Sequence, residues 1–289
     1  MAAPLAWEPE GPSRKPTIVG IGAQKAGTSW LSQMLSQHPQ VWATPFKEIH
    51  FFNHLYIPGH RYWIRWHYRQ KPAEIRARFE RRGEPIPPAM NAYIDRVANS
   101  KHMYTRPWYR WIFHPAPKGT QPMDFTPEYS TIPEDDVQFM AEWLPKARFL
   151  YLIRDPADRA ASQLRMNLDR EKRRPATLDD WMEEVANPVL DERGDYAAYL
   201  PRWQKHAGDR LLVLPYGRIK ADPLGLLGDV ERFCGLVNWD YRNPRTVVFR
   251  GPQQITLPEP AMAALRARLA PQYDYLRETF GPAFLEAIR

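Results

Sequence analysis

The sequence predicts an α/β fold, in which a parallel β-sheet is flanked by helices. Apolar segments of strand length occupy residues 17–21, 148–153 and 210–216, and each leads into a segment with helical features. Strands that alternate with helices in this way are typical of a parallel sheet with helices on both faces. Ligands of such sheets bind at the carboxyl ends of the strands. The residues that follow each strand are therefore the first candidates for a functional site.

The length and composition predict a single domain over residues 1–289. A chain of this size with 44% hydrophobic residues can bury a large core. Residues 1–16 are expected to be a flexible lead-in. Residues 56–121, rich in aromatic residues and prolines, break the strand–helix pattern and are expected to form an insertion or lid. The one cysteine, Cys234, cannot form an internal disulfide and is expected in the core.

The charge of the chain favours anionic partners. The formal net charge is +7 and the isoelectric point is about 9.4, so a positive field attracts negative ligands without identifying one. We find no recognition-helix, RNA-recognition or zinc-finger pattern, and we expect no nucleic-acid partner. A basic-then-apolar leader and a membrane-length apolar run are also not evident, so we expect a cytoplasmic protein without a membrane partner. The oligomeric state is not predicted.

The first strand leads into a turn bounded by Gly22 and Gly27. Four residues separate the two glycines, which is the spacing of a phosphate loop, where backbone N–H groups and the next helix N-terminus face an anion. Thr28 stands where a nucleotide triphosphatase has its lysine, while Lys25 lies inside the loop. The pattern therefore predicts an anion site that differs from that of a triphosphatase.

Later elements have recognisable boundaries. After the strand at 148–153, Asp155 suits a helix N-cap and Pro156 the first helical position. The strand at 210–216 precedes another helix, and Pro271 is expected to kink or split the C-terminal helix.

Two segments of the chain resemble the signature segments of sulfotransferases that use 3′-phosphoadenosine 5′-phosphosulfate (PAPS). They are QKAGTSWL, in the first loop, and LIRDPADRAASQLRMN, after the strand at 148–153. The resemblance implies the sulfotransferase form of the phosphate-loop fold, PAPS as co-substrate, adenosine 3′,5′-bisphosphate as product and no metal. It places the 5′-phosphosulfate on Lys25, Ala26, Gly27, Thr28, Ser29 and Trp30, and the 3′-phosphate on Arg154 and Ser162. The later segment RNPRTVVFRG lies where the family closes a loop over the nucleotide, which adds Arg245 and Arg250.

Two further segments fit the same family. PFKEIHFF resembles the segment that carries the catalytic glutamate in the carbohydrate-type branch, which places the general base on Glu48. His50 is the alternative base, and in a strand the two side chains would share a face. DFTPEY resembles a heparan-type segment that reads acidic-Lys-Thr-Pro-x-Tyr, with Phe125 in place of the lysine. Asp124 could orient a lysine or a donor amide, or it could cap a turn.

The implied reaction is in-line transfer of a sulfuryl group to a hydroxyl or amine of a carbohydrate or small-molecule acceptor. Lys25 would stabilise the charge that develops on the leaving oxygen, and the base would take the acceptor proton. Each role has a structural rival: Lys25 could bind only the ground state, Glu48 could pair with Lys47 or Arg65, Arg154 could pair with Asp155 or Asp158, and Ser162 could be an ordinary helix serine.

Other interpretations stay open. The glycine spacing alone would also suit a phosphate-loop kinase, and the charge would suit a non-catalytic anion-binding module. His50 and His54 have the spacing of two ligands on one helical face, but no further ligand motif accompanies them. The aromatic residues of the insertion could line an acceptor pocket or simply pack together: Tyr62, Trp63, Trp66, Trp108, Tyr109 and Trp111.

Overall fold

A computed structural model describes residues 14–246 and 255–289 and shows a five-stranded, fully parallel sheet with helices around it. The predicted fold class is confirmed. The strand order is β2-β3-β1-β4-β5. The strands are β1 (Ile18–Gly22), β2 (Val41–Ala43), β3 (Gln121–Phe125), β4 (Arg148–Ile153) and β5 (Leu211–Pro215).

Strand β1 lies at the centre because it is apolar on both faces, as a strand covered on two sides must be. Position 20 requires glycine, because a Cβ there would lie 2.2 Å from Cδ1 of Phe125. The chain first builds β2 and β3 on one side of β1, and then β4 and β5 on the other. The connections thus change direction at β1, and such a point opens a crevice at the carboxyl end of the strand.

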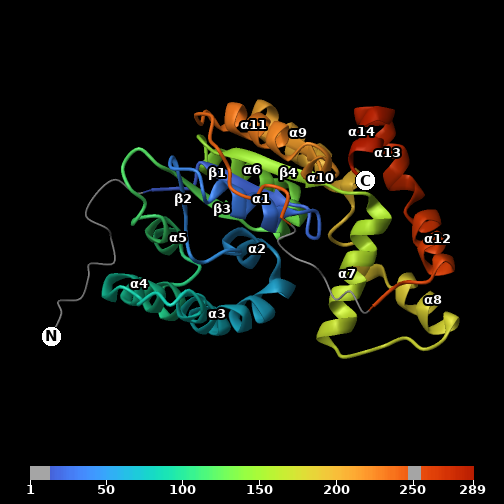
Figure 1. The fold of residues 1–289 in the computed structure, drawn as a ribbon, viewed down its shortest axis with the longest axis horizontal. Coiled ribbons are helices and arrows are strands. Elements are labelled where there is room, and N and C mark those ends of the chain that lie inside the picture. The colour runs from blue at the N-terminus through green and yellow to red at the C-terminus, as the bar shows by residue number, and fades with distance from the viewer. Residues whose placement is uncertain (1–13, 247–254) are drawn as a thin grey trace.

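The helices form groups on either side of the sheet and at one end of the molecule (Figure 1). Helices α2 to α5 lie below the sheet in that view, α9 and α11 lie above it, and α7, α8 and α12 form a group at its right. The helices are α1 (Thr28–Leu35), α2 (Phe51–Tyr56), α3 (Arg61–Arg81), α4 (Pro88–Asn99), α5 (Arg106–Ile112), α6 (Glu134–Trp143), α7 (Pro156–Arg170), α8 (Leu178–Ala186), α9 (Tyr196–Ala207), α10 (Arg218–Ala221), α11 (Pro223–Cys234), α12 (Glu259–Arg268), α13 (Ala270–Phe280) and α14 (Pro282–Ala287).

The helix boundaries follow local chemistry. Asp155 caps α7 by accepting a hydrogen bond of 3.0 Å from the backbone N–H of Asp158, with Pro156 at the first helical position, as predicted. The predicted split at Pro271 is also confirmed: α12 ends at Arg268, and α13 begins one residue before the proline. Cys234 is a buried free thiol, as expected.

Residues 56–121 contribute helices α3, α4 and α5. Their aromatic side chains differ in burial. Trp108, Tyr109 and Trp111 are buried in the core, Trp63 is partly buried, and Tyr62 and Trp66, one turn apart on α3, are 87% and 60% exposed. Packing therefore accounts for the buried residues, and the exposed pair is accessible to a ligand.

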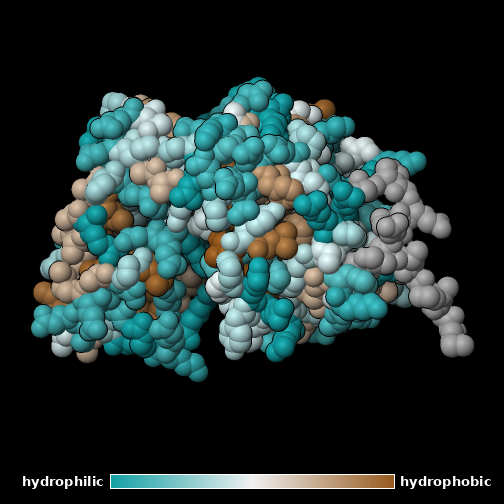
Figure 2. All heavy atoms as spheres, turned by 180° about the vertical axis from the view of Figure 1, so that it is seen from behind, coloured by the Kyte–Doolittle hydropathy of each residue, from teal (hydrophilic) through white to brown (hydrophobic). Residues whose placement is uncertain are grey.

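The surface is largely hydrophilic on the face seen from behind, with scattered apolar residues (Figure 2). Its lower edge is notched between the part of the molecule that holds α3 and the part that holds α7. Within the described residues, no helix is both long enough and apolar enough to cross a membrane.

Candidate active site

The candidate residues gather where β1, β3 and β4 end. The loop that contains Lys25 follows β1, and Arg154 follows β4. The guanidinium Nη1 of Arg154 donates a 3.1 Å hydrogen bond to the backbone oxygen of Lys25. The backbone N–H of Glu48 donates to the oxygen of Phe125, the last residue of β3, at 3.2 Å. Hydrogen bonds thus join the loop after β1 to Arg154, and the segment of Glu48 to the end of β3, at the carboxyl edge of the parallel sheet.

The glycine-bounded loop depends on Gly27. Its φ is +89°, in the left-handed region, and a Cβ there would lie 2.4 Å from Cδ1 of Ile219. Any side chain at this position would thus meet both backbone strain and a clash. Thr28 is the buried first residue of α1, and the indole N–H of Trp30 donates to the oxygen of Pro244 at 2.9 Å. That bond joins α1 to the segment that leads toward residue 245.

The loop lies in a strongly positive environment. Burial, followed by the charges of Arg170, Arg154 and Arg165, lowers the pKa of Lys25 to about 8, against the opposing charge of Glu48. Cations gathered this closely repel one another, and a bound anion would attract all of them. The arrangement therefore suits an anion.

Arg154 holds its position without a carboxylate partner. Its guanidinium lies 4.6 Å from the ring centre of Tyr216, and its Nε is buried without a hydrogen-bond partner among the described residues. Asp155 instead accepts a hydrogen bond from the hydroxyl of Tyr273 at 2.7 Å. Within the described part of the chain, no ion pair joins Arg154 to Asp155 or Asp158, so the structural alternative for Arg154 receives no support.

The remaining nucleotide candidates differ in position. Ser162 is partly exposed on α7, one turn before Met166, whose sulfur lies 3.9 Å from Nζ of Lys25. This face of α7 therefore fronts the loop. Arg245 is exposed, and its Nη1 reaches the oxygen of Lys220 at 3.5 Å. Arg250 lies outside the described residues.

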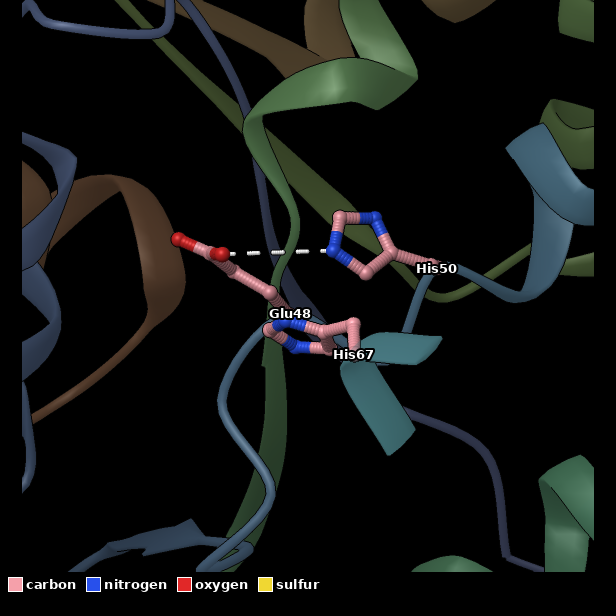
Figure 3. Close-up of side chains that lie close together, drawn as sticks. All are labelled: Glu48, His50 and His67. Carbon is pink, nitrogen blue, oxygen red and sulfur yellow. Dashed lines mark ion pairs between the residues drawn. The ribbon is translucent and has the colours of Figure 1, made fainter. Parts of the chain in front are cut away.

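Glu48 and His50 approach each other. The segment is not a strand, because both residues have positive φ, 65° and 56°, before α2, so the shared strand face that was one possibility does not arise. Even so, Nε2 of His50 lies 3.9 Å from Oε2 of Glu48 (Figure 3). Among the described residues six non-glycines have positive φ, and Lys25, Glu48 and His50 are three of them. Backbone strain of this kind concentrates at functional sites.

The carboxylate of Glu48 is ionised and can accept a proton. Burial is the largest single effect and raises its pKa, but Lys47, His50, Lys71 and His67 together outweigh burial and bring the pKa below its ordinary value. Nζ of Lys47 lies 3.3 Å from Oε1 of Glu48 and donates to Oγ of Ser29 at 2.7 Å. The partner of Glu48 is thus Lys47 and not Arg65. Lys47 also links the phosphate loop to the candidate base, a role that the sequence analysis missed.

His50 is a buried, neutral imidazole. Its side chain is 1% exposed and meets the ring of Trp63 edge-on at 4.8 Å, and burial lowers its pKa to about 4. Its Nδ1 lies 3.7 Å from Oε2 of Glu128, a second buried carboxylate. Oε1 of Glu128 accepts a hydrogen bond of 3.3 Å from Nε2 of Gln24 and lies 3.5 Å from Nη1 of Arg193. Sequence analysis did not single out Glu128, although it lies within DFTPEY.

Asp124 and Phe125 are structural. Asp124 is buried and accepts hydrogen bonds from the hydroxyls of Tyr109, Tyr129 and Thr126 at 2.9, 2.9 and 2.7 Å. It therefore holds together part of the aromatic core, a role outside the two alternatives considered from the sequence. The ring of Phe125 packs over Gly20, where the related motif has a lysine.

The ring of His54 has different neighbours from that of His50. It lies on α2 and stacks on the ring of Tyr104 with 3.5 Å between ring centres. The spacing of the two histidines thus does not produce a shared ligand pair.

The chain matches known proteins over most of its length. A family model described as "Sulfotransferase family" matches residues 16–241. Human heparan sulfate glucosamine 3-O-sulfotransferase 3A1 is 24% identical over 78% of this chain and 46% of its own length. Human bifunctional heparan sulfate N-deacetylase/N-sulfotransferase 1 is 25% identical over 78% of this chain and 22% of its own length. The chain thus spans about half, or less, of the length of these relatives.

Solved structures show the same fold. A sulfotransferase from Alicyclobacillus acidocaldarius superposes with a TM-score of 0.63 at 21% identity, covering 92% of this chain and 95% of its own. The sulfotransferase domain of the Synechococcus PCC 7002 olefin synthase reaches a TM-score of 0.51 at 16% identity, covering 91% and 97%.

Proposed function

We proceed from the finding that this chain belongs to the sulfotransferase family, and we propose that it transfers a sulfuryl group from PAPS to an acceptor hydroxyl or amine. The observation that carries the proposal is the contact between Arg154 and the backbone of Lys25. Because this contact joins the two predicted anion-binding segments, it supports the binding of one nucleotide, with phosphates at its 3′ and 5′ positions, by both.

The nucleotide would be held at its two charged ends. Backbone N–H groups of the loop and the N-terminus of α1 would bind the 5′-phosphosulfate, together with the ammonium group of Lys25. Arg154 would bind the 3′-phosphate, since its planar guanidinium suits a phosphate and its buried Nε has no partner among the described residues. Ser162, on the face of α7 that fronts the loop, would add a neutral donor.

The transfer would proceed by in-line displacement. The acceptor oxygen or nitrogen forms a bond to sulfur while the bond between sulfur and the 5′-phosphate oxygen breaks, and the electron pair leaves with that oxygen. Lys25 would stabilise the developing negative charge. The acceptor proton would pass to Glu48, with neutral His50 beside it. The related motif has a lysine where this chain has Phe125. Lys47, which contacts both Ser29 and Glu48, would supply the positive charge in its place.

The acceptor is proposed to be a carbohydrate or a small molecule. The curated relatives are named for heparan sulfate, which supports a carbohydrate, and the exposed Tyr62 and Trp66 on α3 offer rings for stacking on a sugar. The cytoplasmic location and the absence of nucleic-acid or membrane partners stay predictions from the sequence.

The test is an assay with labelled PAPS and a panel of neutral and anionic saccharides and small hydroxyl compounds. We expect transfer of label and release of adenosine 3′,5′-bisphosphate. Lys25→Ala and Glu48→Gln should each lower turnover by at least about a hundredfold, and Glu48→Gln should keep the affinity for adenosine 3′,5′-bisphosphate. Glu142→Gln, at an exposed glutamate on α6, is the matched control.

Three results would contradict the proposed function. A protein that transfers no label to any acceptor and does not bind adenosine 3′,5′-bisphosphate is not the enzyme proposed here. Saturable binding of magnesium–ATP in its place would favour the kinase interpretation. Salt-dependent binding of an anionic polymer that survives Lys25→Ala combined with Arg154→Ala would favour a binding module.

A further inference from the structure

Three side chains beside the proposed nucleotide site have ligand atoms close together. They belong to Glu48 and His50, in the segment that precedes α2, and to His67, on α3 (Figure 3). One ligand atom of each lies within 4.8 Å of the other two. We propose that Glu48, His50 and His67 form a binding site for a transition-metal ion of the Zn²⁺ type, and that the bound ion inhibits the enzyme.

The histidines carry atoms that need a partner. His50 is 1% exposed, and neither of its ring nitrogens has a hydrogen-bond partner among the described residues. Its distances of 3.9 Å to Glu48 and 3.7 Å to Glu128 exceed those of hydrogen bonds. Nε2 of His67 is likewise buried and unpartnered there. Buried polar atoms without partners are costly, and a metal ion would satisfy both histidines at once.

The donor set selects a particular kind of metal. Two imidazole nitrogens and one carboxylate oxygen suit zinc and its neighbours in the first transition row, whereas magnesium and calcium prefer oxygen donors alone. A histidine must be unprotonated to bind a metal. Burial lowers the pKa of His50 to about 4 and that of His67 to about 3, so both lone pairs are available at neutral pH.

The three ligand atoms would need to move only a little closer together to bind one ion. Zinc binds nitrogen and oxygen ligands at about 2.0–2.2 Å, so two ligand atoms on one tetrahedral ion lie roughly 3.4 Å apart. The atoms of Glu48 and His50 are 3.9 Å apart, and all three lie within 4.8 Å. Glu48 and His67 are both partly exposed and have room to move. Three protein ligands leave a fourth position open, as in zinc sites that bind water or substrate.

A carboxylate lies behind the buried ligand. Oε2 of Glu128 is 3.7 Å from Nδ1 of His50, on the side of the ring away from Glu48. Metal-binding histidines commonly donate their second ring N–H to such a carboxylate, which fixes the ring and strengthens the ligand. Opposing charges come from Lys47, 3.3 Å from Glu48, and from Lys71 and Arg193, both of which lower the pKa of His50. A metal would displace Lys47 from Glu48, while the bond from Lys47 to Ser29 can remain.

The inhibitory part of the inference rests on the proposed function, whereas the binding site does not. A metal ion bound to one carboxylate oxygen of Glu48 withdraws negative charge from the whole carboxylate and makes it a much weaker base. Occupancy of the site therefore opposes proton transfer from the acceptor to Glu48.

Zinc binding is tested by titration calorimetry of the full chain with ZnCl₂ after treatment with chelator and dialysis. We expect one ion per chain, and Co²⁺ should give the visible absorbance of a site of low coordination number. His67→Ala and His67→Gln should weaken zinc binding by more than the roughly 10- to 100-fold that loss of an outer partner costs. His114→Ala, at an exposed histidine outside the cluster, should leave binding unchanged.

Two results would overturn the site: no zinc binding by the unaltered protein, or equal binding by the His67 variants and the His114 control. Circular dichroism checks the fold of each variant, and the measurement on the unaltered protein decides the matter if a variant does not fold.

Activity is measured separately. Micromolar zinc should inhibit transfer, chelator should restore it, and His67→Ala should be active and insensitive to zinc. Zinc binding without any effect on transfer would overturn the inhibition. A protein that binds zinc but transfers no sulfuryl group under any condition would overturn the proposed function and leave the metal site standing.

Discussion

Replacing Arg154 by alanine should weaken the binding of adenosine 3′,5′-bisphosphate. In the free protein Nη1 of Arg154 donates to the oxygen of Lys25 at 3.1 Å, the guanidinium stacks on Tyr216 at 4.6 Å, and the buried Nε has no partner in the described part of the chain. The arginine is thus held in place before the ligand arrives, so little ordering of the side chain opposes binding.

The magnitude follows from the bond that is lost. A hydrogen bond to a charged group contributes about 1.5–3 kcal/mol, which corresponds to a roughly 10- to 150-fold increase in the dissociation constant. Arg154→Lys should recover only part of the affinity, because an ammonium group lacks the fork that binds two phosphate oxygens.

Titration calorimetry with adenosine 3′,5′-bisphosphate measures the effect directly. Arg148, at the other end of β4, is the matched control: it donates to the oxygen of Asp209 and lies away from the carboxyl end of the strand. Arg148→Ala should therefore leave the affinity unchanged. A dissociation constant for Arg154→Ala within about twofold of the unaltered protein, or an equal loss in Arg148→Ala, would refute the assignment of the 3′-phosphate to Arg154.

Three further predictions concern charge, the loop and the core. Because the pKa of Lys25 is lowered to about 8, its positive charge is present below that pH and lost above it, so affinity for the bisphosphate, measured by calorimetry, should fall between pH 7 and 9. Gly27→Ala should lower the free energy of unfolding in urea by about 1–3 kcal/mol more than Gly83→Ala, since both glycines have positive φ but only Gly27 has close neighbours. Asp124→Asn should cost about 1–3 kcal/mol in the same assay, because an amide cannot accept from all three hydroxyls.

Each of these predictions has a contrary outcome. An unchanged pH dependence in Lys25→Ala would show that another group titrates. Equal destabilisation by the two glycine variants would show that backbone conformation alone sets the requirement at Gly27. An Asp124→Asn variant as stable as the unaltered protein would mean that its hydroxyl partners find other acceptors.

Much of the fold was predictable because its signals are local. The strand at 148–153, the cap at Asp155 and the break at Pro271 each depend on residues within one or two turns, and all three are confirmed. The conformation around Glu48 and His50 was not predictable, because the backbone there turns through positive φ, which neighbouring residue types did not indicate.

The site was only partly predictable. Lys47 was noted as a neighbour of Glu48, but its contact with Ser29 spans 18 positions in the sequence. No sequence spacing linked Glu128 or His67 to His50. Glu128 approaches His50 from the segment after β3, and His67 approaches it from α3.

The sequence by itself determined the parallel architecture, the glycine-bounded loop and the family, because apolar periodicity, glycine spacing and short motifs act over a few adjacent residues. Only the tertiary structure decided which groups surround Glu48, that Asp124 serves the aromatic core, and that Phe125 packs over Gly20. The reason is physical: hydrogen bonds and charges act over a few ångströms in space, and folding alone sets which distant residues come that close.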